Sequence, residues 1–318
     1  LCYWKGTKPT GSCRVCVVEI DGWRTLAPAC ATVATPGMVI HTNNDRVTAA
    51  RKMIIELLLA SGNHNCLICE ANGECELQAL AYRYQVPTPS FADPPGTPYY
   101  YEANNSMIVR DFSKCVMCGR CVRACNERQV NQAISIGYRG HGNKIVAKAD
   151  RTYIESDCVF CGECVQACPV GALLDKAAIG QGRPWERRTV RTTCPYCGVG
   201  CQIDLHVKGG RIIKVTGAPL VPNDGRLCIK GRFGMGFVHH PDRLTTPLIR
   251  KNGELQPASW DEALDLVAAK LKEIKEKYGP QTIGGWCSAR ITNEENYLFQ
   301  KFMRAVIGSN HVDHCARL

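Results

Sequence analysis

The chain has 318 residues, of which 45% are hydrophobic, and 39 Lys and Arg against 29 Asp and Glu give a formal net charge of +10. Its 21 cysteines come in tight runs, which favours metal binding and excludes a secreted disulfide scaffold, because such scaffolds are shorter and space their cysteines more evenly. Since no run of eighteen apolar residues occurs, we expect no transmembrane segment and a cytoplasmic protein of several domains.

The first cysteines, here called the two-iron group, lie in residues 1–44. They are Cys2, Cys13, Cys16 and Cys30. Residues 13–23 alternate like a strand that ends in a turn at Asp21 and Gly22. A long loop with several ligands, followed by one distant ligand, is typical of a [2Fe-2S] cluster in a plant-type ferredoxin domain. The spacing differs from the short plant spacing, so buried structural cysteines remain the alternative.

A helix is predicted at 45–60, ending at Ser61 and Gly62. Its apolar face would comprise Val47, Ile54, Leu57 and Leu58. The histidine group follows it and consists of His64, Cys66, Cys69 and Cys75. Three thiolates need a fourth ligand and His64 is adjacent, so we predict a His/Cys3 [4Fe-4S] domain at 45–85; a surface histidine is the alternative. A neutral imidazole removes one negative charge, which tends to raise the reduction potential.

A proline-rich linker is predicted at 86–104, and a pseudo-repeat follows at 105–182. The first run is Cys115, Cys118, Cys121 and Cys125, and the second run is Cys158, Cys161, Cys164 and Cys168. This doubled pattern, with proline after Cys168, is typical of bacterial ferredoxins that hold two [4Fe-4S] clusters. Zinc is the alternative, but four-cysteine zinc sites lack the doubled pattern.

In such ferredoxins the fourth cysteine of each run binds the other run's cluster. We therefore predict that Cys168 joins the first three cysteines of the first run, and that Cys125 joins the first three of the second run. Gly119 and Gly162 would let the backbone wrap closely around the clusters.

The last group lies in a small β-rich [4Fe-4S] domain predicted at 187–246. Its members are Cys194, Cys197, Cys201 and Cys228. Residues between them predict a β-hairpin that turns at Gly209 and Gly210.

Residues 247–318 predict the beginning of an α/β domain. A capping box from Ser259 to Glu262 would start a helix with an apolar stripe. The stripe consists of Leu264, Val267, Leu271 and Ile274. A strand at 282–289 would precede a second helix that begins near Thr292 and stops at Gly308. Cys287 and Cys315 have no partner spacing, and we interpret them as packing cysteines.

The net charge of the chain is also consistent with clusters. An excess of Lys and Arg over Asp and Glu can indicate a nucleic-acid partner. Iron–sulfur clusters bound by thiolates carry roughly −1 to −2 each, so several of them would offset most of the +10. We therefore expect Lys and Arg to neutralise clusters, and we expect no nucleic-acid partner. The motifs together predict one [2Fe-2S] and four [4Fe-4S] clusters in an α+β multidomain protein.

Four segments carry a family resemblance: CPYCGVGC at 194–201, LCIKGR at 227–232, HPDRLTTPLIR at 240–250 and the stretch from Thr292 to Leu318. They resemble the molybdopterin-dependent oxidoreductases, and specifically the formate dehydrogenase catalytic subunit of the NAD-linked type. In that type, iron–sulfur modules like those of the large iron–sulfur subunit of respiratory complex I precede the molybdenum or tungsten domain.

The resemblance implies bis-molybdopterin guanine dinucleotide carrying Mo or W, with formate and carbon dioxide as substrate and product. Lys230 matches the lysine that lies between the last cluster and the pterin, where it would bind the pterin and assist electron passage. Electrons would leave through the clusters to a flavin- and NAD-binding diaphorase-type partner or to ferredoxin.

The resemblance also bears on both ends of the chain. It implies that the first half of the ferredoxin domain is missing before Cys2, and that the metal-binding cysteine or selenocysteine would follow Leu318. We accordingly expect a fragment that is inactive alone, ending at a selenocysteine codon read as a stop; plain fragmentation of a longer sequence is the alternative. Two alternatives are a non-catalytic electron-transfer subunit like that of complex I and the N-terminal region of an iron-only hydrogenase. The segment CPYCGVGC disfavours the hydrogenase.

Overall fold

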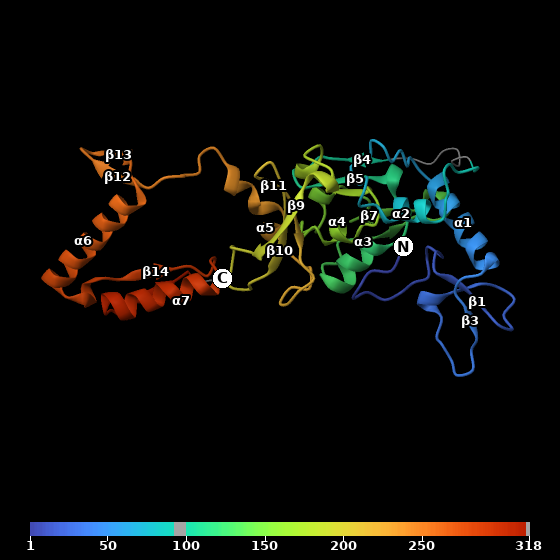
Figure 1. Ribbon diagram of the computed structural model, residues 1–318, viewed down its shortest axis with the longest axis horizontal. Coiled ribbons are helices and arrows are strands. Elements are labelled where there is room, and N and C mark those ends of the chain that lie inside the picture. Colours follow the sequence, from blue (N-terminus) through green and yellow to red (C-terminus); the bar gives the residue numbers. More distant parts are fainter. Residues whose placement is uncertain (92–99, 316–318) are drawn as a thin grey trace. The chain divides into compact units, whose positions relative to one another are not determined.

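The computed structural model describes residues 1–91 and 100–315. The chain divides into two compact units, and each is described by itself. Unit 1 comprises Leu1–Val190, Asp204–Gly217 and Arg226–Phe233, and unit 2 comprises Arg191–Ile203, Ala218–Gly225 and Gly234–Leu318. Both mix helices with small sheets, as the α+β prediction requires (Figure 1). Across the described ranges, no helix has the length and apolar character needed to cross a membrane.

Unit 1 begins with a small antiparallel sheet of order β2-β1-β3. Its strands are β1 (Val17–Ile20), β2 (Ala27–Pro28) and β3 (Ile40–His41). Helix α1 (Asp45–Ala60) has the predicted bounds, because the Asn44 side chain accepts a hydrogen bond from the Val47 amide at 2.9 Å and caps its start. The predicted apolar face is wrong in part: Ile55 is fully buried, whereas Leu57 is 48% exposed.

The middle of unit 1 contains a sheet of order β4-β5-β8 and a separate hairpin. Its elements are α2 (Glu76–Arg83), β4 (Tyr101–Glu102), β5 (Ile108–Asp111), α3 (Arg120–Arg123), β6 (Ile134–Gly137), β7 (Lys144–Ala147), α4 (Glu163–Ala167) and β8 (Leu173–Asp175). Strand β4 lies within the predicted linker 86–104, so the end of that segment is ordered against β5. Residues 92–99 of the same segment lie outside the described ranges.

A third sheet has the order β11-β10-β9. Its strands are β9 (Arg188–Thr193), β10 (Gln202–Lys208) and β11 (Arg211–Gly217). The hairpin turn falls at Gly209 and Gly210 as predicted, and both glycines have positive φ, at 54° and 77°. Helix α5 (Ile229–Phe233) follows Cys228.

Unit 2 contains the hairpin β12 (Leu248–Lys251) and β13 (Glu254–Pro257), followed by α6 (Trp260–Tyr278). Strand β14 (Gly285–Cys287) then pairs in parallel with β15 (Val312–His314). Helix α7 (Asn293–Lys301) connects them and continues as a π-helical turn, Phe302–Ile307, that ends at Gly308. A parallel pair joined by a helix is the βαβ unit expected at the start of an α/β domain.

Two details of the helix predicted to start at Ser259 differ from the structure. Ser259 caps α6 by accepting from the Glu262 amide at 3.1 Å, but the Glu262 carboxylate binds Lys251 at 2.6 Å and does not complete the capping box. The apolar stripe is not buried in unit 2: Leu264 is 58% and Val267 is 55% exposed. The hydrophobic periodicity predicted the helix correctly, but it did not predict whether the apolar stripe is buried.

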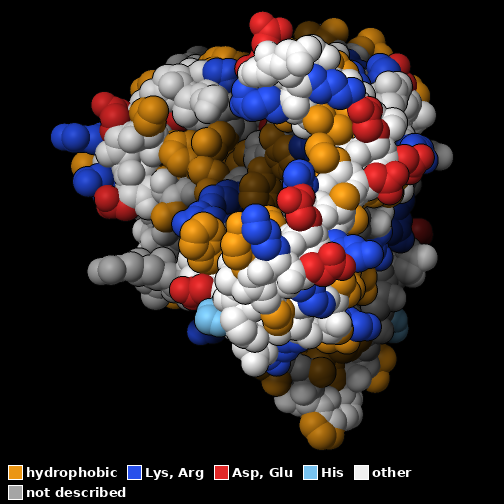
Figure 2. All heavy atoms as spheres, turned by 90° about the vertical axis from the view of Figure 1, so that its left-hand side faces the viewer, with side chains coloured by type: hydrophobic (Ala, Val, Ile, Leu, Met, Phe, Trp, Pro, Cys, Tyr) orange, Lys and Arg blue, Asp and Glu red, His pale blue; other side chains and the backbone are white. Residues whose placement is uncertain are grey.

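The positive charge of the chain is distributed rather than gathered on the face shown in Figure 2. There, Lys and Arg side chains alternate with Asp and Glu, and hydrophobic side chains lie between them. Several arginines are instead buried inside unit 1, including Arg110, Arg120, Arg123 and Arg232. Part of the chain's positive charge is therefore located in the interior of unit 1.

Arg110, on β5, is a buried arginine of the β4-β5-β8 sheet. Its guanidinium binds the Glu102 carboxylate of β4, and its Cζ lies 4.1 Å from the ring centroid of Tyr153. The other Glu102 oxygen accepts from the Tyr153 amide at 3.0 Å. All three side chains are buried or nearly so, which makes the pair costly to break.

Arg110→Met should lower the free energy of unfolding by about 3–5 kcal/mol, because it leaves the buried Glu102 carboxylate without its cation. Lys148→Met removes a cation from an exposed pair with Asp157 and should cost about 1 kcal/mol or less. Urea denaturation followed by circular dichroism measures both losses. Equal losses in the two variants would contradict the importance given to the buried pair.

Candidate metal centres

The two cysteine runs have the same backbone geometry, which extends their sequence repeat into three dimensions. Met117 and Phe160, one residue before the second cysteine of each run, have φ values of 49° and 51°. Gly119 and Gly162 have φ values of 69° and 71° and immediately precede α3 and α4. Each run is therefore a tight loop with two left-handed residues that leads into a short helix.

Amide groups in these loops point at the cysteine sulfurs. The Phe160 amide donates to the Cys158 Sγ at 3.4 Å. Burial raises the pKa of the Cys115 thiol to about 11, although the Met117 amide opposes the rise. Hydrogen bonds of this kind stabilise a thiolate and tune a cluster bound by it. Because burial keeps these thiols protonated when no metal is bound, iron binding has to displace their protons.

The fourth cysteine of each run interacts electrostatically with cysteines of the other run. Burial raises the pKa of Cys168 to about 12, together with smaller contributions from the Cys118 and Cys115 thiols. The pKa values of Cys158, Cys161 and Cys164 are raised first by burial and also by Cys125. The fourth cysteine of each run thus lies near the first three of the other run, which is the arrangement that the crossed assignment requires; the assignment itself stays a prediction.

The two-iron group is also brought together in unit 1. The Cys2 amide donates to the Cys13 Sγ at 3.3 Å, and both side chains are buried. The pKa of Cys30 is raised to about 11 by burial, and also by Cys16 and Cys2. Cys2, Cys13 and Cys16 come from the segment before β1, and Cys30 comes from the short helical turn after β2.

The histidine group lies at the start of α2. His64 and Cys66 line an open cavity of about 810 Å³. Cys75 caps α2, its Sγ accepting from the Gln78 amide at 3.4 Å. Burial raises the pKa of Cys75, and Cys69 and Cys66 raise it further, so the three thiols are electrostatic neighbours.

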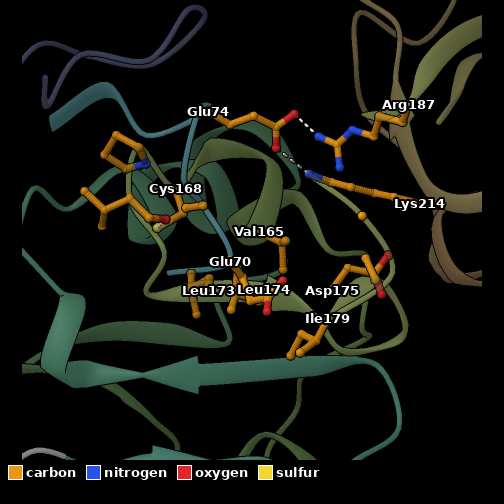
Figure 3. Close-up of a pocket in the computed structure, with 15 residues that line it drawn as sticks. Glu70, Glu74, Val165, Cys168, Leu173, Leu174, Asp175, Ile179, Arg187 and Lys214 are labelled. Carbon is orange, nitrogen blue, oxygen red and sulfur yellow. Dashed lines mark hydrogen bonds and ion pairs between the residues drawn. The ribbon is translucent and has the colours of Figure 1, made fainter. Parts of the chain in front are cut away.

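The Cys168 loop packs directly on the histidine group. A Cβ added at Gly171 would lie 2.8 Å from the Cys69 Sγ, so a glycine is required there. The Glu76 amide donates to the Pro169 carbonyl at 2.8 Å. Figure 3 shows a neighbouring pocket of about 90 Å³, in which Cys168 lies near the ion pairs of Glu74 with Arg187 and Lys214.

Arg123 connects the two-iron group with the first run. Its guanidinium donates to the carbonyls of Cys2 and Cys118 and to the Thr10 hydroxyl, the last at 2.7 Å. Arg120 is also buried and forms a two-pronged pair with Glu76 at 2.6 and 2.7 Å. Both arginines are within α3, and neither was predicted from the sequence to be a functional residue. Their only sequence signal is their position on either side of Cys121.

The members of the last group belong to different units. Cys194, Cys197 and Cys201 are in unit 2, where the Cys194 amide donates to the Cys201 carbonyl at 2.8 Å. Cys228 is in unit 1 and is exposed, as is Lys230 on α5. Their roles as ligands and as a pterin contact stay predictions.

Cys315 is exposed and lies 3.3 Å from the Ser288 hydroxyl, so it is not the buried packing cysteine that was expected. The residues after it, Ala316 to Leu318, are the last three of the family segment that begins at Thr292, and they lie outside the described ranges.

The donor set fits iron–sulfur clusters, which are held by cysteine thiolates. Among the described side chains, no three His, Cys, Asp or Glu residues converge at the distances of one metal ion. Many of the thiols lie in enclosed surroundings, with amide donors and arginines around them. Cluster ligands bind different irons and lie farther apart than those of one zinc ion.

Five family descriptions match the chain in succession. They are the 2Fe-2S iron-sulfur cluster binding domain at 1–45, the NADH-ubiquinone oxidoreductase-G iron-sulfur binding region at 51–90, the 4Fe-4S dicluster domain at 114–172, the molybdopterin oxidoreductase Fe4S4 domain at 187–240 and molybdopterin oxidoreductase at 243–318.

Curated relatives match over nearly the whole chain. The chain is 39% identical to an NADH-quinone oxidoreductase subunit of Rhizobium meliloti over 99% of its residues and 36% of the relative. It is 38% identical to the NADPH-Fe(3+) oxidoreductase subunit alpha of Geobacter sulfurreducens over 100% of its residues and 37% of the relative. It is 34% identical to a protein of Staphylococcus aureus named "Putative formate dehydrogenase", over 100% of its residues and 36% of the relative.

A solved structure matches part of the chain. The crystal structure of an NAD+-reducing [NiFe]-hydrogenase in the H2-reduced state is 35% identical, with a TM-score of 0.51, over 56% of this chain and 75% of that chain. The present chain spans little more than a third of the length of the curated relatives. Residues 187–240 and 243–318 match models of the molybdopterin oxidoreductase family, and residues 51–90 match the iron–sulfur binding region of NADH-ubiquinone oxidoreductase-G.

Proposed function

We propose that this chain is the iron–sulfur electron-transfer portion of a formate dehydrogenase, which oxidises formate to carbon dioxide and passes the electrons towards an NAD-reducing flavin partner. The observation that carries the proposal is the grouping of buried thiols in unit 1 ahead of a βαβ segment of the molybdopterin type. The family resemblance of residues 292–318 and the name of the S. aureus relative support formate as the substrate.

When bound, iron–sulfur clusters accept and release single electrons, and a pterin-bound Mo or W takes two electrons from formate. The chain's own residues would supply thiolate ligands, hold them in enclosed loops and balance their charge. The two-iron group, the histidine group, the two runs and the last group would hold one [2Fe-2S] and four [4Fe-4S] clusters. Lys230 would bind the pterin.

A second candidate is a protein that transfers electrons between NAD(P)H and another acceptor without formate. The higher identity to the Rhizobium and Geobacter relatives, at 39% and 38%, favours this candidate. The two candidates share the same clusters and differ in which molecule delivers electrons to them.

The electron donor separates the two candidates. In the complete protein, purified anaerobically with its partner subunits, formate should bleach the visible absorbance of the clusters, since the pterin site would feed electrons into them. The matched sample receives NADPH in place of formate. Bleaching by NADPH together with no response to formate would reject the formate proposal in favour of the second candidate.

Iron content tests the cluster assignment. The chain reconstituted under anaerobic conditions should contain about eighteen iron atoms, from one two-iron and four four-iron clusters. Plasma emission spectrometry measures iron and zinc in the same sample. Stoichiometric zinc in place of iron would show that the cysteines hold a different metal.

The crossed assignment predicts which signal each cysteine controls. Cys168→Ser should perturb the electron paramagnetic resonance signal of the first run's cluster, because Cys168 lies near Cys115 and Cys118. Cys125→Ser, the matched variant, should perturb the second run's cluster instead. If each variant altered the cluster of its own run, the ligands would pair within runs and the crossed assignment would be wrong.

A further inference from the structure

Arg232 of α5 inserts its side chain into the loop of the second run. It is 3% exposed, although it lies on the same short helix as the exposed Lys230. Its Nε donates to the Cys161 carbonyl at 2.7 Å, and its Nη1 donates to the Gln166 Oε1 at 2.5 Å. The remaining nitrogen, Nη2, lies 3.3 Å from the Glu163 carboxylate. All three guanidinium nitrogens thus contact the second run's loop or the helix α4 that follows it.

Glu163 is a carboxylate with no exposed surface, and it immediately precedes Cys164. Two arginines hold it, since Arg128 Nε donates to its Oε1 at 2.9 Å and Arg232 faces its Oε2. A buried carboxylate is stable only with such partners. Arg128, Glu163 and Arg232 together form a buried triad with a net charge of +1 beside the second run.

The loop is shaped to admit Arg232. A Cβ added at Gly162 would lie 2.1 Å from the Arg232 Cδ and 2.8 Å from the Phe233 Cζ. The equivalent glycine of the first run, Gly119, has nearly the same φ, but the nearest atom to its added Cβ is 3.8 Å away, at the Arg123 Nη1. Glycine is therefore favoured at position 162 for two reasons, the left-handed turn and the close approach of α5. At position 119 only the left-handed turn favours glycine.

We propose that Arg232 is a positioning residue that sets the reduction potential of the second run's cluster and fixes α5, with Lys230, against that cluster's loop. The inference rests on the proposed function, because it requires a cluster at the second run. Reduction adds one negative charge to a cluster, so a buried cation beside it favours the reduced form and a buried anion disfavours it. Arg232 and Glu163 should therefore shift the potential in opposite directions.

Two substitutions test the proposal in the reconstituted chain. One removes a buried positive charge, and the other removes a buried negative charge. An anaerobic redox titration followed by electron paramagnetic resonance measures the midpoint potential of each cluster. Arg232→Met should reduce the ratio of reduced to oxidised second-run cluster about tenfold at the wild-type midpoint, a shift of about 59 mV to more negative potential for a one-electron couple. Glu163→Gln should shift the potential of the same cluster to more positive values. Arg211→Met, which removes an exposed arginine at the start of β11, is the control for net charge.

A second pair of variants separates the Arg232 contact from the general effect of disturbing a loop. Gly162→Ala should displace Arg232 and shift the second-run potential in the same direction as Arg232→Met. Gly119→Ala imposes the same backbone strain without meeting α5, so it should leave the second-run potential unchanged.

Each outcome supports or overturns one claim. Opposite shifts of the second-run potential in Arg232→Met and Glu163→Gln support the proposal. If Arg232→Met loses the cluster, a potential that shifts in Gly162→Ala but not in Gly119→Ala supports the proposal independently. Intact clusters whose second-run potential is the same in Arg232→Met, Glu163→Gln and wild type would overturn this inference alone. A wild-type chain without any cluster signal would overturn the proposed function and this inference with it.

Discussion

Balancing buried thiolate charge is the constraint on which unit 1 depends. Cys115, Cys121 and Cys168 lie in enclosed loops where burial, the largest cause, raises their pKa values, so a thiolate there requires iron, amide donors or a nearby cation. The fold supplies the last two from the chain itself. Amides at the left-handed turns point at the sulfurs, and arginines are drawn into the interior next to the loops. This explains why arginine, which is seldom buried, is buried here repeatedly.

The first run and the Cys168 loop of the second run are where the cysteine groups of unit 1 meet. Arg123 joins the Cys118 carbonyl of the first run to the Cys2 carbonyl of the two-iron group. The Cys168 loop packs on the histidine group through Gly171 and Pro169. One apolar core includes Cys2, Cys13 and Cys118, with Cys75, Cys115 and Cys168 against it. Short separations through packed protein are what a series of single-electron carriers requires, and the fold provides them between these groups.

Local patterns in the sequence predicted local structure well. Asn44 and Ser61 bound α1, the glycine pair bounds the β10–β11 hairpin, and the doubled spacing predicted two loops with equivalent backbones. Long-range features were not predictable in this way. Whether Leu57 or Ile55 faces the core depends on which element packs on α1, and the partners of Arg123 and Arg232 come from segments far away in the chain. The cysteine spacing could indicate ligands but not the cations that neutralise them.

The central claim is that nineteen of the chain's 21 cysteines and one histidine hold both two-iron and four-iron clusters. The Mössbauer spectrum of the chain reconstituted with iron-57 tests it most directly, because it distinguishes the two cluster types and measures their proportions. The account predicts [2Fe-2S] and [4Fe-4S] iron in a ratio of about 1 to 8, with no other major component. A spectrum dominated by mononuclear or unspecifically bound iron would contradict it.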